Sequence, residues 1–102
     1  MVKITKWFED KAPKETEFRS VLESEGFTVE TKTEEAGVMQ DPSVSNQEKS
    51  LVVLEGLARI TLPDLPEDFM DLMAGDRLDI PKGTNHGLMI GPAGATILEG
   101  KK

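Results

Sequence analysis

The stretch GDRLDIPKGTNH, residues 75–86, decides the fold of this chain. It follows the pattern G-x5-P-x-G-x2-H, a short strand closed by a tight turn with a histidine just beyond it. Pro81 ends the strand pairing because proline has no amide donor, and Gly83 permits the reversal. The chain then re-enters a sheet and carries His86, the only histidine in the sequence, to one mouth of a β structure.

The rest of the chain predicts one short helix followed by many short strands. Phe18, Val21 and Leu22 have the i, i+3, i+4 spacing of an amphipathic helix, and Gly26 follows as its C-terminal cap. A hairpin is expected at Glu55-Gly56, and a loop with at most one short strand, near residues 38–39, is expected over 34–50. The other strands are expected at residues 3–8, 27–33, 78–80, 86–90 and 95–99, with a turn at 91–94 between the last two. Such spacing favours an antiparallel sandwich or barrel.

The length of 102 residues fits one domain, and no internal linker interrupts it. We therefore expect a single domain over 1–102, with an N-terminal strand and helix in 1–26 and a barrel in 27–100. Because the chain has no cysteine, it forms no disulfide and no thiolate metal site.

The charge pattern excludes some partners. The net charge is -7 and the 12 basic residues are scattered, which argues against nucleic acid and against an anionic membrane surface. No apolar run is long enough for a membrane-spanning helix, and the first residues do not resemble a secretory signal. We expect a cytoplasmic location.

The VLEG sequence at 53–56 with the strand after it, followed by the stretch at 75–86, resembles the cupin superfamily. Gly75, Pro81, Gly83 and His86 match the second motif of that superfamily, G-x5-P-x-G-x2-H-x3-N. The resemblance covers roughly residues 27–99, although Ile90 stands at the asparagine position. It implies an all-β fold, a double-stranded β-helix (jelly-roll) that forms an antiparallel barrel, with one short N-terminal helix. It also implies a homodimer, since small cupins commonly pair and a short barrel leaves edges to cover.

The first motif of metal-binding cupins, G-x5-H-x-H-x3-4-E-x6-G, is not matched. If its last glycine is aligned with Gly56, the glutamate position falls on Lys49. The two histidine positions then fall on Ser43 and Ser45, or on Pro42 and Val44 with the longer spacing.

The resemblance therefore implies a degenerate metal site in which His86 is the only candidate ligand. Catalytic divalent metals normally need three protein ligands, so we expect no cofactor, with a bound divalent metal as the minor alternative. Glu48 is one residue away from the glutamate position and, in a regular strand, would face the other way.

Four residues are candidates for a ligand pocket: His86, Lys49, Ser45 and Ser43. We expect the protein to bind a small molecule without metal chemistry, and an acidic one if Lys49 faces inward. The alternative is a cupin enzyme of isomerase, epimerase or dioxygenase type with a non-standard site around His86. The metal-free form of that enzyme needs an acid or base such as Glu48 or Asp79 to face inward. The sequence leaves open which residues are catalytic, how Lys49 points, and whether side chains fill the cavity.

Overall fold

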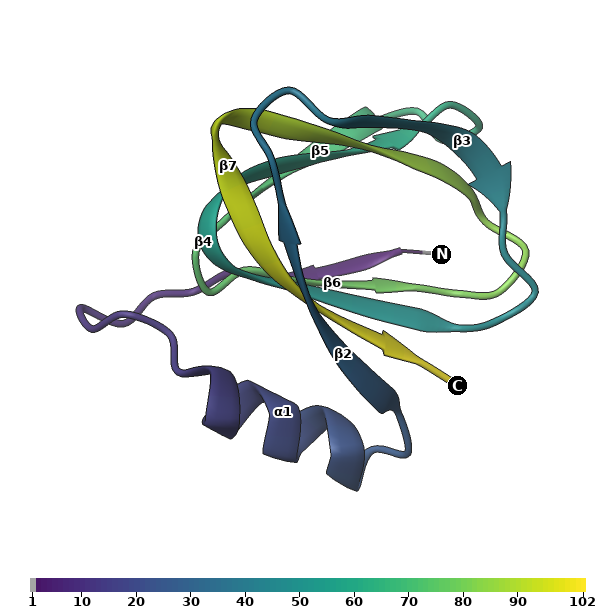
Figure 1. Cartoon of the computed structure of the whole chain (residues 1–102). Helices are drawn as coiled ribbons and strands as arrows, with labels where there is room; N and C mark the ends of the chain where they lie inside the picture. The colour runs from purple at the N-terminus through teal and green to yellow at the C-terminus, as the bar shows by residue number, and fades with distance from the viewer. Residues whose placement is uncertain (1) are drawn as a thin grey trace.

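The structure is a computed structural model that describes residues 2–102. Seven antiparallel strands and one helix make up the fold (Figure 1). In chain order the elements are β1 (Lys3–Thr5), α1 (Glu15–Ser24), β2 (Thr28–Glu34), β3 (Met39–Val44), β4 (Lys49–Leu62), β5 (Asp68–Met73), β6 (Arg77–Ile80) and β7 (Asn85–Lys101). The expected all-β jelly roll with one short N-terminal helix is confirmed, although the sheet does not close into a complete barrel.

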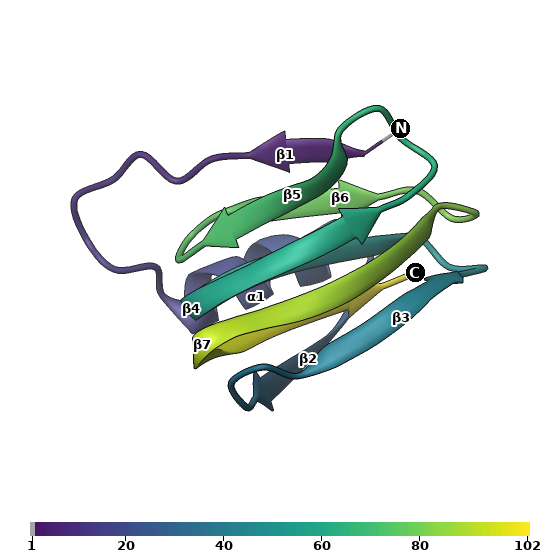
Figure 2. The same cartoon turned by 90° about the horizontal axis from the view of Figure 1, so that it is seen from above.

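One continuous sheet folds over on itself to form two layers, because β4 and β7 are long enough to run through both (Figure 2). The first layer contains β1, β6, residues 49–54 of β4, residues 96–101 of β7, and β2. We call it the helix-side sheet, since α1 lies against it (Figure 1). The second layer contains β5, residues 57–62 of β4, residues 85–90 of β7, and β3, and we call it the open sheet.

The hairpin expected at Glu55-Gly56 and the turn expected at residues 91–94 are both wrong. At these places β4 and β7 continue as strands and bend from one layer into the other. Gly56 and Gly94 have φ angles of 83° and 77°, which residues with a Cβ rarely adopt. The pairing of β4 with β7 also shifts register on either side of Gly56, and such bulges sharpen a bend. Gly56 and Gly94 therefore mark places where the chain changes direction, and here the change is a bend within a continuous strand.

The loop expected over residues 34–50 contains a full strand. β3 spans Met39–Val44 and is exposed along its whole length, so its sequence lacks the alternation of a half-buried strand. Pro42 is tolerated because β3 is an edge strand whose pairing with β7 is irregular between Gln40 and Ser43. The first strand is shorter than expected, since β1 ends at Thr5. The expected helix is confirmed, with Gly26 just beyond it at a φ of 94°.

Two apolar clusters stabilise the layers. The larger one fills the space between the two sheets and includes Leu51, Ile60, Leu78 and Ile97. The smaller cluster lies between α1 and the outer face of the helix-side sheet, and it consists of Leu22, Phe27, Val52, Leu54 and Leu98. Because side chains alternate along a strand, β4 and β7 supply both clusters from neighbouring residues.

A buried carboxylate holds the N-terminal segment against the sheet. Asp76, which is 4% exposed, accepts hydrogen bonds from the backbone amides of Trp7 and Met73 and from the Lys6 ammonium. Burial by itself raises the pKa of Asp76, but the two amides and Lys6 more than offset this, so its pKa lies below the usual value. The Trp7 ring packs on Phe18 of α1, with 5.5 Å between the ring centroids.

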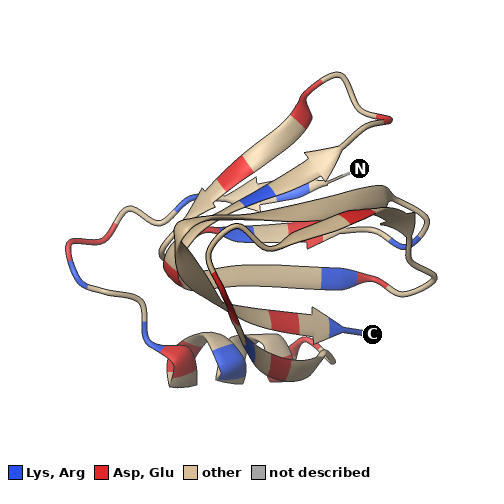
Figure 3. Cartoon of the chain, turned by 45° about the horizontal axis from the view of Figure 1, so that its top comes forward, with Lys and Arg blue, Asp and Glu red and all other residues tan. Residues whose placement is uncertain are grey.

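Lys and Arg are distributed among Asp and Glu over several of the described elements (Figure 3). Within residues 2–102, α1 is neither long enough nor apolar enough to cross a membrane.

Candidate functional site

A cavity of about 80 Å³ opens between the two layers, and its lining comes from β2, β3, β4 and β7. Its inner wall is the end of the apolar core, formed by Leu51, Ile60, Leu88 and Ile97. Toward the outside the lining becomes polar. Side chains two residues apart in a strand share a face, so Lys49 lies on the same inward face of β4 as Leu51, and Glu99 on the same inward face of β7 as Ile97.

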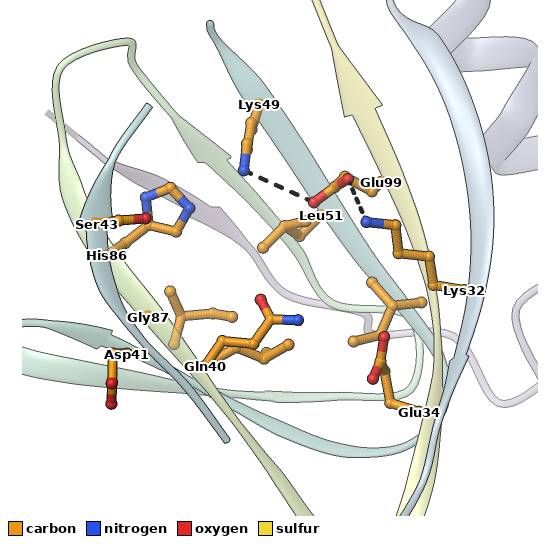
Figure 4. A pocket seen from close by; sticks show the side chains of 13 residues that line it. Lys32, Glu34, Gln40, Asp41, Ser43, Lys49, Leu51, His86, Gly87 and Glu99 are labelled. Atoms are coloured by element: carbon orange, nitrogen blue, oxygen red, sulfur yellow. Dashed lines mark ion pairs between the residues drawn. The ribbon is translucent and has the colours of Figure 1, made fainter. Parts of the chain in front are cut away.

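A partly buried carboxylate lies at the centre of the charged part of the lining. The Glu99 side chain is 13% exposed, and three ammonium groups surround it. Its Oε1 lies 2.9 Å from Nζ of Lys32 and 3.4 Å from Nζ of Lys101, and its Oε2 lies 3.9 Å from Nζ of Lys49 (Figure 4).

The lysines decide the ionisation of Glu99. Burial alone raises the pKa of Glu99, but the hydrogen bond from Lys32 and the charges of the three lysines reverse the effect and lower it. The same hydrogen bond raises the pKa of Lys32. Glu99 is therefore a carboxylate at neutral pH, and the lysine that it binds most closely is an ammonium.

His86 faces the same cavity from the opposite side. It is paired in register with Ser43 of β3, and both side chains line the cavity (Figure 4). Nδ1 of His86 lies 3.1 Å from the carbonyl oxygen of Thr84, which accepts a hydrogen bond from it. With Nδ1 holding a proton, Nε2 of the neutral ring is an acceptor, and it becomes a donor when the ring is protonated.

The cavity brings together three of the four predicted pocket residues. Lys49, His86 and Ser43 line it, and the inward direction of Lys49 answers the question that the sequence left open. Ser45 does not line it. Its hydroxyl accepts a hydrogen bond from the amide of Gln47, and its carbonyl accepts one from Gly83, so it stabilises the turns near the cavity. Whether the three residues bind a ligand stays a prediction.

Sequence reasoning missed Glu99, Lys32, Glu34 and Gln40, which also line the cavity. Alternation along the last strand could have indicated Glu99, because it shares a face with Ile97. Nothing in the sequence signals Lys32 or Gln40, since β2 and β3 reach the cavity only through their pairing with β7.

The acid or base that the metal-free enzyme alternative required is not supplied by Glu48 or Asp79. Neither of them lines the cavity. Glu48 forms an ion pair with Lys102 at 3.7 Å, and Asp79 binds Arg77 on the helix-side sheet.

The residues of the cavity do not fit the metal that the cupin resemblance implies. Within residues 2–102, no three His, Cys, Asp or Glu side chains form a group that could hold a metal ion. The ammonium of Lys49 projects into the same cavity as His86, where it would repel a divalent cation.

Solved structures of other proteins share the fold of this chain. No family model matches the chain, and no curated protein does either. Among solved structures, an RmlC-like cupin from Shewanella frigidimarina shares 17% identity with a TM-score of 0.64, covering 74% of this chain and 64% of that one. The polyketide cyclase RemF from Streptomyces resistomycificus shares 25% identity with a TM-score of 0.64, covering 74% of this chain and 54% of that one.

A third structure is similar over its whole length. A DUF861 family protein from Thermotoga maritima shares 16% identity with a TM-score of 0.62, and the match covers 100% of both chains. The chain thus spans about two thirds and about half of the first two neighbours, and all of the third. These features define a jelly-roll protein with a cavity between its layers. The chain has the fold of these structures, several of which are described as cupins.

Proposed function

We propose that this protein binds a small molecule in the cavity between its layers and does so without a metal. The proposal is supported by one observation above all: Lys49, His86 and Ser43 converge on a cavity whose inner wall is apolar. A concave site with an apolar wall and a few convergent polar groups is the usual form of a small-molecule site.

The size of the cavity limits the ligand. A volume of about 80 Å³ is well below that of pockets for drug-sized ligands, which begin at roughly 300 Å³. Since a water molecule takes about 30 Å³ in the liquid, the cavity has room for about three of them, so we expect a ligand of about three or four non-hydrogen atoms, or a larger one of which only the end group enters.

An enzyme of isomerase, epimerase or dioxygenase type remains the second candidate. It is favoured by the orientation of His86, whose Nδ1 is engaged by Thr84 while the ring faces the cavity. For this candidate, turnover of a substrate should disappear in His86→Ala and persist in Lys49→Ala.

A cavity-blocking pair of variants tests the binding proposal. Ser43→Phe places a ring in the cavity, whereas Val44→Phe, one residue further along the same edge strand, places it on the 65% exposed outer face. Protein purified without tag or chelator is first checked for metal by elemental analysis. A set of small polar fragments is then titrated by amide NMR.

We expect saturable shifts at cavity residues in the parent and in Val44→Phe, at the same fragment concentrations and without metal. Those shifts should be absent in Ser43→Phe. Fragment binding that requires a stoichiometric first-row metal, or binding that survives unchanged in Ser43→Phe, would contradict the proposal.

A further inference from the structure

We infer that the molecule bound in this cavity carries a monocarboxylate, and that the Lys49 ammonium is the counter-ion of that group. This inference rests on the proposed function and adds the chemical class of the ligand.

The first argument is the imbalance of charge around Glu99. Three ammonium groups lie within 4 Å of one carboxylate, which leaves a local excess of positive charge. Lys32 and Lys101 both approach Oε1, at 2.9 and 3.4 Å, whereas only Lys49 approaches Oε2, at 3.9 Å.

Lys49 is the most loosely paired and the least exposed of the three lysines. Its Nζ lies 3.9 Å from Oε2 of Glu99, too far for a hydrogen bond, and its side chain is only 19% exposed, against 36% for Lys32 and 39% for Lys101. Burying most of an ammonium group without a hydrogen-bond acceptor costs free energy. The ammonium of Lys49 faces the cavity, so an acceptor bound there would offset that cost.

The second argument is the convergence of other donors on the same space. The Ser43 hydroxyl and the Gln40 amide both line the cavity, and Figure 4 shows the amide of Gln40 reaching toward its middle. An ionised carboxylate only accepts hydrogen bonds and has about four acceptor sites, so it can satisfy Lys49 and these neighbours together.

The acidic residues of the lining restrict the anion. Glu34 and Asp41 lie on the side of the cavity away from Lys49, and the Asp41 carboxylate points outward (Figure 4). With Glu99 they balance the three lysines over the site as a whole, so the excess of positive charge is confined to the Lys49 end of the cavity. A dianion such as phosphate would therefore be repelled, whereas a monocarboxylate placed beside Lys49 meets mainly positive charge.

The chain thus places one of its own cations where metal-binding members of the superfamily place a metal ligand. Lys49 occupies the glutamate position of the first motif. An ammonium can attract and orient a carboxylate, as a metal would, without requiring the missing histidines.

The test compares three probes at constant ionic strength, set with sodium chloride: sodium acetate, neutral acetamide of nearly the same shape, and sodium phosphate. Binding is followed by amide NMR and by isothermal calorimetry. The variant is Lys49→Met, which keeps the aliphatic stem. The matched control is Lys101→Met, because Lys101 also pairs with Glu99 but does not line the cavity.

We expect acetate to bind the parent more tightly than acetamide or phosphate does. Lys49→Met should weaken acetate by about tenfold or more, the usual effect of losing a charged hydrogen-bond partner. Lys101→Met should bind acetate within about threefold of the parent, because the lost charge lies further from the ligand.

A second variant keeps the inference testable if Lys49→Met does not fold. In Glu99→Gln a competing negative charge is removed from beside Lys49, so acetate should bind about fivefold more tightly. Acetate binding that is unchanged or weaker in a folded Glu99→Gln would overturn the inference.

The outcomes distinguish failure of the monocarboxylate assignment from failure of small-molecule binding itself. If acetamide binds as well as acetate, or if phosphate binds best, the monocarboxylate assignment is wrong while small-molecule binding stands. If no probe and no fragment shifts the cavity residues, both are wrong.

Discussion

The two layers of this protein share β4 and β7, yet one layer is covered on both faces and the other on only one. On the helix-side sheet, Val52, Leu54 and Leu98 face α1 and are at most 9% exposed. On the open sheet, residues of the same two strands face outward without cover, and Leu57 and Met89 are 39% and 37% exposed.

The difference teaches that strand sequence alone does not set burial in a folded-over sheet. β4 and β7 each pass from one layer into the other at a glycine. The side chains on their outer faces are covered by α1 on one side of that glycine and uncovered on the other side. Apolar residues before and after the bend therefore meet different environments, and the helix decides which of the two outer faces becomes a core.

The largest expected effect comes from the bend itself. In Gly56→Ala a methyl group would collide with the carbonyl oxygen of Gly94, in addition to the cost of a positive φ. We expect a loss of about 3 kcal/mol or more in the free energy of unfolding, measured by urea denaturation. Gly37→Ala is the control, since Gly37 has a φ of 76° but open space around it, and it should cost only about 1–2 kcal/mol. Equal losses in the two variants would mean that the bend tolerates a side chain.

The next effect separates the covered face from the uncovered one. Leu98→Ala removes a fully buried side chain beneath α1 and should lower the free energy of unfolding by about 2–5 kcal/mol. Met89→Ala, on the same strand but on the outer face of the open sheet, should cost about 1 kcal/mol or less. Chemical denaturation of both variants checks this, and a large loss in Met89→Ala would show that something covers the open sheet in solution.

The third effect tests the anchor of the N-terminal segment on the helix-side sheet. Asp76→Asn keeps the shape but loses the charge that binds Lys6 and two amides, so we expect a loss of about 1–3 kcal/mol at pH 7.

The pH dependence of this difference has a defined sign. Because the pKa of folded Asp76 lies below its ordinary value of 3.8, the unfolded chain binds the proton more readily. The stability that Asp76 contributes is thus present above that value and is lost as the pH falls through the lowered pKa. Denaturation curves of the parent and Asp76→Asn should converge in strong acid. A gap that stays constant from pH 7 down to strong acid would show that the carboxylate charge is not what matters.

The smallest effect concerns the ion pair between the end of α1 and the sheet. Arg77 donates hydrogen bonds of 2.7 and 3.1 Å to Glu25, and the hydrogen bond is the main cause of the lowered pKa of Glu25. Since the Glu25 side chain is 42% exposed, we expect Glu25→Gln to cost only about 0.2–1 kcal/mol, and less in high salt. Glu23→Gln, on the same helix, should have no measurable effect, and a similar loss in both would point to helix propensity instead of the pair.

The homodimer expected from the sequence stays a prediction. The open sheet presents exposed Met39, Val44, Phe69 and Met73, while α1 already covers the other outer face. Sedimentation equilibrium of the parent and of Met89→Ala would relate the oligomeric state to this face.

The sequence by itself determined the class of fold and one end of the site. Gly75, Pro81, Gly83 and His86 lie close together in the chain, so their spacing predicted a strand, a turn and a histidine at one mouth of the β structure. The helix was equally readable, since its apolar stripe and Gly26 are local signals. Alignment of the first motif also brought Lys49 and Ser43 to notice, although it included Ser45, which instead stabilises a turn.

Tertiary structure alone decided where the strands bend and which charges meet. A glycine with a positive φ has the same sequence signature in a hairpin as in a bent strand, and only the continued pairing of β4 with β7 distinguishes the two. Likewise Lys32, Lys49 and Glu99 are distant in sequence, and the antiparallel register of β2, β7 and β4 brings them within hydrogen-bonding or ion-pair distance. Their meeting depends on non-local pairing, because no local pattern encodes which strands will become neighbours.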